Sequence, residues 1–217
     1  SLQHQLRGLF NSHKISNYIW MSYCYWPSIR NLFFKSRSFT PIPLLLMMLY
    51  FARPNSPYFL LGIFLIVIGE IIRLRSVSFA GGETRTMNVG ASSICKSGPY
   101  SIVRNPLYIG NMMIYVGFAF VAGSVYVVTI SSITLVYFLI QYSLIISLEE
   151  EALEKKFGDE YITYKKLVPS ILPRINNTFR NYDTIPTSLA KTLKTEKRTL
   201  QNILLVSLLL FLRINSF

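Results

Sequence analysis

The sequence predicts an all-α, multi-pass transmembrane protein with about five spans arranged in helical hairpins, and three observations carry this prediction. The chain has 217 residues, of which 51% are hydrophobic and only 15% are charged. Charged and apolar residues are segregated along the chain, as a bilayer requires. Every second connection between apolar stretches is rich in lysine and arginine, which is typical of loops on the cytosolic side.

Five apolar stretches define the expected spans. A helix needs roughly 20 residues to cross a hydrocarbon core of about 30 Å. The fourth stretch is long enough alone, whereas the first, second and last need flanking residues or tilt. The stretches cover residues 41–52, 58–72, 107–123, 125–148 and 200–212.

The breaks between these stretches set the topology. Residues 53–57 form a turn with two prolines, and Gly123–Ser124 is so short that its flanking stretches must form a hairpin. Both breaks are nearly free of positive charge, whereas residues 73–105 and 149–199 are basic. We therefore predict a cytosolic N-terminus and a site for a soluble cofactor where the two basic segments meet the membrane. The expected parts are an interfacial segment (1–38), a membrane core (39–175), and a C-terminal linker with the last span (176–217).

Composition excludes several kinds of site. His4 and His13 both lie in the N-terminal tail, so the membrane body contains no histidine. This excludes a Ser–His–Asp triad or a histidine-ligated zinc there. Cys24 and Cys95 are too far apart for a metal knuckle, and we expect no metal. The basic residues that give the net charge of +12 lie in short segments beside the apolar stretches. We therefore expect anionic lipid headgroups rather than nucleic acid as the partner of these residues.

The first candidate segment is residues 97–111, SGPYSIVRNPLYIGN. A structural interpretation explains much of it: a Gly–Pro turn, Asn105 as an N-cap, Pro106 at the first helical position and Gly110 in helix packing. The functional interpretation adds that the helix N-terminus and Arg104 together would bind an anion at the bilayer surface.

The second candidate segment is residues 148–164, LEEEALEKKFGDEYITY. A helix that emerges into water, with Glu151 and Lys155 as an i, i+4 pair and Gly158 at its end, explains the later residues. Glu149 and Glu150 lie deepest, where carboxylates are costly unless they are solvated or paired. They are candidates to bind a cation. Glu70 with Arg73 is better explained as an ion pair.

Taken together, these segments resemble a known family. The order GPYxxVRNPxYxGN, a hairpin, EExxLxxxFGxxYxxY and VPxxLPR is similar to the isoprenylcysteine carboxyl methyltransferase and phospholipid methyltransferase family, over roughly residues 40–175. The resemblance implies a membrane methyltransferase that uses S-adenosylmethionine in a cytosolic pocket. The bacterial branch of the family is the most similar, so we expect the protein in a bacterial inner membrane. Asn105 stands where many members have histidine.

The resemblance also implies roles for particular residues. Arg104 or Arg174 would orient an ionised acceptor as the catalytic residues, and the mechanism would be in-line displacement of the methyl group, favoured by proximity and desolvation. An amine acceptor would instead lose a proton to a glutamate or tyrosine. The implied cofactor-binding residues are Ser97, Gly98, Pro99, Tyr100, Asn105, Tyr108, Glu149 and Glu150.

Two other classes of function stay open at this stage. Membrane sterol reductases have a comparable Arg–Tyr–Gly segment and would transfer hydride from NADPH. A non-enzymatic membrane scaffold or transporter is disfavoured because the spans contain few polar residues to form a path. The lipid-like acceptor, whether a carboxylate or an amine, and the oligomeric state are not specified by the sequence.

Overall fold

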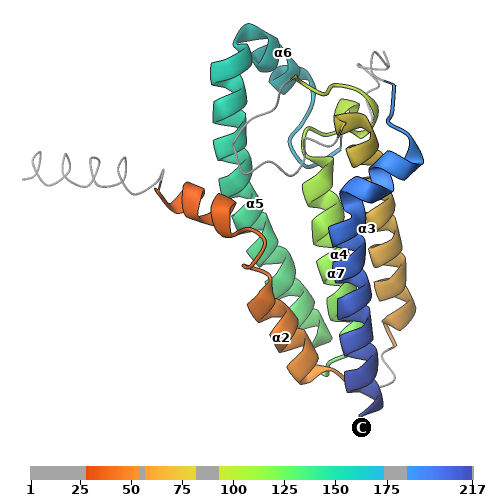
Figure 1. Cartoon of the computed structure of the whole chain (residues 1–217). Coiled ribbons are helices and arrows are strands. Elements are labelled where there is room, and N and C mark those ends of the chain that lie inside the picture. Colours follow the sequence, from red (N-terminus) through yellow and green to blue (C-terminus); the bar gives the residue numbers. More distant parts are fainter. Residues whose placement is uncertain (1–27, 54–56, 82–92, 174–184, 217) are drawn as a thin grey trace, which may run out of the picture.

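The computed structural model describes residues 28–53, 57–81, 93–173 and 185–216. Within these ranges all regular structure is helical and there is no strand, as the sequence predicts. Residues 28–36 are helical and precede the other elements, of which the α-helices are labelled in Figure 1. Those elements are α2 (Ile42–Phe51), α3 (Phe59–Ala80), the 3-10 helix η2 (Gly98–Ser101), α4 (Pro106–Ala122), α5 (Val127–Phe157), α6 (Asp159–Leu167) and α7 (Leu189–Asn215).

The closest pair of helices is α3 and α4, which meet glycine against glycine. A Cβ atom added to Gly69 would lie 2.7 Å from the carbonyl oxygen of Gly110, and one added to Gly62 would lie 2.7 Å from that of Gly117. The two glycines of each helix are seven residues apart, or about two helical turns, so both contacts fall on one face. Small residues at such a face allow helix backbones to approach closely, as expected for Gly110.

The two tight breaks in the sequence lie at the same end of the molecule. Gly123 ends α4 in the left-handed conformation, with φ of 66°, and α5 begins four residues later. The backbone N–H of Arg53 donates to the carbonyl of Ala122 over 2.9 Å, which joins the α2–α3 break to the α4–α5 hairpin. In Figure 1 this end lies opposite α6. The predicted hairpin of α4 and α5 is therefore present, whereas α2 packs on α4 and α7.

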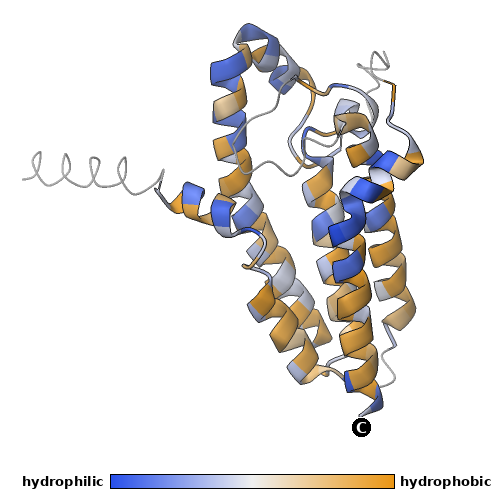
Figure 2. Cartoon of the chain, in the orientation of Figure 1, coloured by the Kyte–Doolittle hydropathy of each residue, from blue (hydrophilic) through white to orange (hydrophobic). Residues whose placement is uncertain are grey.

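The helices divide the molecule into an apolar and a polar end. Figure 2 shows hydrophobic residues along α2, α4 and the second half of α7, and hydrophilic residues on α6 and the first half of α7. Two helices, α5 and α7, are long and apolar enough to cross a bilayer. Helices α2 and α4, with 10 and 17 residues, fall short of the roughly 20 residues that a span needs. Membrane association is thus indicated, while the number of five spans stays a prediction.

Helix α7 follows α3 and α4 closely but faces outward over most of its apolar half. Exposed side chains such as Leu204, Leu208 and Phe211 cover that half, whereas Leu210 is buried in a core cluster with residues of α2, α3 and α4. Its beginning is fixed by a backbone hydrogen bond of 2.8 Å from Thr187 to Ser78. An apolar face of this kind suits contact with lipid.

Candidate active site

The candidate site lies at the polar end, where the start of α4, the second half of α5, α6 and η2 come together. Pro106 occupies the first turn of α4, as predicted. Asn105 stands at the N-cap position, but its side chain makes no capping hydrogen bond. Its amide instead donates to the Ser170 hydroxyl over 3.1 Å. The capping role that we expected for the Asn105 side chain is therefore wrong, because the segment after α6 binds this amide.

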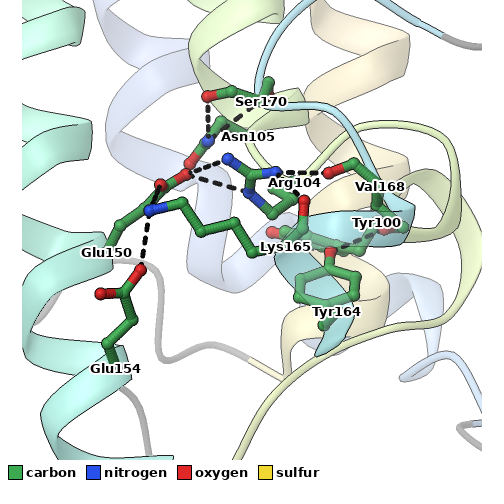
Figure 3. Close-up of polar contacts among 9 residues, drawn as sticks. All are labelled: Tyr100, Arg104, Asn105, Glu150, Glu154, Tyr164, Lys165, Val168 and Ser170. Atoms are coloured by element: carbon green, nitrogen blue, oxygen red, sulfur yellow. Dashed lines mark hydrogen bonds and ion pairs between the residues drawn. The ribbon is translucent and has the colours of Figure 1, made fainter. Parts of the chain in front are cut away.

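The centre of the site is an ion pair between Arg104 and Glu150 (Figure 3). The guanidinium donates from Nε and Nη2 to one oxygen of Glu150, at 2.9 and 2.7 Å. It also donates to the carbonyl oxygens of Lys165, at 3.0 Å, and Val168. Both charged side chains are about nine-tenths buried. Arg104 is thus not the free anion-binding group that we expected, since Glu150 and two carbonyls already use its donors.

Lys165 completes this cluster from α6. Its ammonium lies 3.2 Å from Glu150 and 2.7 Å from Glu154, and Figure 3 shows it reaching across both carboxylates. The hydrogen bond with Glu154, and then the bond to Glu150, raise the pKa of Lys165 above its ordinary value. The lysine therefore remains a cation at neutral pH.

Tyr164 of α6 attaches η2 to this cluster. The Tyr164 hydroxyl donates to the carbonyl of Tyr100 over 2.7 Å, and burial raises the pKa of Tyr164, so the hydroxyl stays protonated at neutral pH. Gly98 begins η2 at φ of 61°, and a Cβ atom there would lie 2.5 Å from the Phe79 ring. Glycine is therefore required at this turn.

Glu149 faces a different side of α5 from its neighbour. Consecutive residues of a helix point roughly 100° apart, so Glu150 meets Arg104 while Glu149 meets Tyr108. The Tyr108 hydroxyl lies 2.9 Å from both oxygens of the Glu149 carboxylate, and its ring stacks on Tyr142 with centroids 4.4 Å apart. The charge of Arg37 also acts on Glu149. Glu149 is partly exposed, so it is the carboxylate still able to receive a cation.

Most of the predicted residues thus gather at one end of the molecule. Ser97, Gly98, Pro99 and Tyr100 form η2 and its start, beside α6. The second candidate arginine, Arg174, lies outside the described residues. Sequence reasoning missed Lys165 and Ser170, whose contacts with residues of the first segment cross more than 60 positions of chain. Spacing gives no signal for such pairs.

Part of the chain is similar to a curated protein that is named for metal resistance. The chain is 28% identical over 125 residues to the nickel-cobalt-cadmium resistance protein NccN of Alcaligenes xylosoxydans xylosoxydans. The match covers 58% of this chain and about half, 52%, of the relative. No solved structure matches the chain.

The part of the chain that contains the site is similar to a known protein family. Residues 57–160 match the family described as phospholipid methyltransferase. This range runs from the start of α3 to the beginning of α6, and it holds the Arg104–Glu150 pair together with Tyr108 and Glu149. The resemblance drawn from the motifs is confirmed: residues 57–160, just under half of the chain, are similar to the phospholipid methyltransferase family, the family of isoprenylcysteine and phospholipid methyltransferases.

Proposed function

We propose that this protein transfers a methyl group from S-adenosylmethionine to a lipid-like acceptor at the polar, cytosolic end of the helices. The family match suggests a methyltransferase with a lipid-like substrate. The observation that supports the cofactor is the Glu149 carboxylate, which is held by Tyr108 and is partly exposed. A carboxylate in this state attracts a cation.

The residues present fit the charges of S-adenosylmethionine. The cofactor supplies a methyl group on a cationic sulfonium, and it also has an ammonium group. Glu149 would hold one of these cationic groups, with the aromatic rings of Tyr100 and Tyr108 beside it. The Arg104–Glu150 pair would act indirectly, because it fixes the segment after α6 against the start of α4.

The chain's own contribution to the reaction would be orientation and exclusion of water. A lipid acceptor would approach from the apolar half, where exposed leucines of α7 and apolar faces of α5 lie. A carboxylate acceptor is ionised at neutral pH and needs no general base. An amine acceptor would need to lose a proton, and Glu149, Glu150 or a tyrosine would be the base. Proximity and desolvation would supply most of the acceleration.

Binding of the cofactor is the direct test. In calorimetric titrations of detergent-purified protein, S-adenosylmethionine should bind saturably, and Glu149→Gln should weaken binding about 10- to 100-fold, the range for a lost charged hydrogen bond. Glu151→Gln is the matched control, because Glu151 lies two residues further along α5 and pairs with Lys155 at the surface. Its affinity should equal that of the wild type.

Two results would contradict the proposal. Binding of NADPH without S-adenosylmethionine would favour the reductase, and equal binding by Glu149→Gln and wild type would remove Glu149 from the site. A positive titration is followed by transfer of labelled methyl into lipid extracts. That assay separates carboxylate from amine acceptors, since methyl esters are cleaved by mild base and methylamines are not.

A further inference from the structure

A second polar cluster lies between α3, α4 and α7, and neither the motifs nor the family match accounts for all of it. Its centre is Arg73 of α3, whose Nη2 lies 2.8 Å from a carboxylate oxygen of Glu196 in α7. The same nitrogen donates to the Thr199 hydroxyl over 3.1 Å. Glu196 is fully buried and Arg73 is 7% exposed. A carboxylate oxygen of Glu70 lies 3.8 Å from Nε of Arg73, and these two residues form the i, i+3 pair that the sequence predicts.

The arginine connects this cluster to α4. Its other terminal nitrogen, Nη1, donates to the side-chain oxygen of Asn111, one turn after Tyr108. The Asn111 side chain also interacts with that of Tyr142, and the Tyr142 ring stacks on Tyr108. Tyr108 in turn holds Glu149. A continuous chain of contacts therefore runs from Glu196 through four helices to the candidate cofactor carboxylate.

Helix α7 lies outside residues 57–160, yet it supplies one end of this chain. Its apolar half is mostly exposed. Lipid could cover that half, so the helix does not need the other helices to bury its apolar side chains. A buried Arg–Glu pair is costly to desolvate, and apolar residues of similar size often give equal stability. The cluster is therefore poorly explained as packing alone. Its contact with Asn111 also connects it to the residues around Tyr108.

We propose that Glu196 is a positioning residue for the candidate site, so that α7 is a functional part of the methyltransferase region. Glu196 fixes the guanidinium of Arg73, which fixes Asn111 and, through Tyr142, the ring of Tyr108. Loss of the Glu196 charge would release Arg73 toward Glu70, and Glu149 would lose its fixed orientation. This inference rests on the proposed function, because Glu149 is taken as the cofactor carboxylate.

A double-mutant cycle tests the proposal, with two measurements on each protein. Glu196→Gln, Asn111→Ala and the double variant are compared with the wild type in S-adenosylmethionine affinity and in thermal unfolding without ligand. We expect Glu196→Gln to weaken binding about tenfold and to add little when Asn111 is already alanine, because coupled residues are not additive. The matched control is Leu210→Ala, which removes a buried contact of α7 and should lower the melting temperature while leaving affinity unchanged.

The possible failures are distinguishable. Additive unfolding effects of Glu196→Gln and Asn111→Ala would overturn the chain of contacts itself. Coupled unfolding with unchanged affinity in Glu196→Gln would overturn the positioning role, and so would an equal loss of affinity in Leu210→Ala. If the wild type binds no S-adenosylmethionine, the proposed function fails and the positioning role fails with it, whereas the unfolding cycle still reports on the contacts.

Discussion

Replacing Arg104 with alanine is expected to lower the melting temperature by about 10 °C, because it leaves Glu150 buried without its main partner. Breaking a buried ion pair from one side costs about 3–5 kcal/mol, and each kcal/mol corresponds to about 2–4 °C in a chain of this size. The same change frees the carbonyls of Lys165 and Val168. The segment after α6 would then separate from α4, and S-adenosylmethionine binding should be lost as well. Thermal unfolding of purified protein, followed by titration, measures both effects.

Three further variants show whether the ion pair is the cause. Arg104→Lys keeps the charge but loses the forked donor geometry, so it should recover only part of the stability. The double variant Arg104→Ala, Glu150→Ala should lose less than the sum of the single variants. Lys155→Ala breaks an exposed pair with Glu151 and should change stability by less than about 1 kcal/mol. If Arg104→Ala unfolds at the wild-type temperature, the pair does not stabilise the site.

Introducing leucine at Gly110 is expected to have the largest effect on the packing of the helices. The added Cβ would lie 2.6 Å from Cγ of Arg73 and 2.7 Å from the carbonyl oxygen of Gly69. The backbone of α3 cannot move aside without also disturbing its contact at Gly117. Overpacking costs about 1–3 kcal/mol or more, and the displaced Arg73 would add to this. We expect little folded protein in detergent, as measured by size-exclusion chromatography and thermal unfolding.

A graded series separates bulk from position. Gly110→Ala adds one methyl group and should lower the melting temperature less than Gly110→Leu does. Ser143→Leu adds similar bulk on an exposed face of α5, where lipid or detergent accommodates it, and should behave like the wild type. Normal folding of Gly110→Leu would mean that α3 and α4 do not meet at these glycines.

The helices of this protein could be predicted where local chemistry sets their limits. Pro106 and Gly123 bound α4 within one residue of the expected stretch, and Gly158 ends α5 as predicted. The end of α3 was predicted too early, because hydropathy falls at Glu70 and Arg73 while the helix continues to Ala80. Backbone hydrogen bonds do not depend on the polarity of side chains, so a helix extends beyond the apolar stretch within it.

The site shows the same division between local and distant effects. The two segments with the motifs were recognisable, and the structure brings them together. Their pairing was not predictable: Glu149 and Glu150 are adjacent in sequence, yet one contacts Tyr108 and the other Arg104. The Arg73–Glu196 pair joins residues 123 positions apart. No spacing rule links such residues, because only the packing of α7 on α3 makes them neighbours.

Because Arg73 and Glu196 are 123 positions apart, they are synthesised at different times. A ribosome adds about 5–20 residues per second, so Glu196 emerges on the order of 10 s after Arg73. During that interval α3, α4 and α5 can already pair, with Arg73 in contact with Glu70 and Asn111 but not yet with Glu196. We predict that a released chain ending at residue 188 leaves α3 more open to protease than one ending at residue 216, and equal protection would contradict this. The candidate site would thus mature only after translation has moved well beyond it.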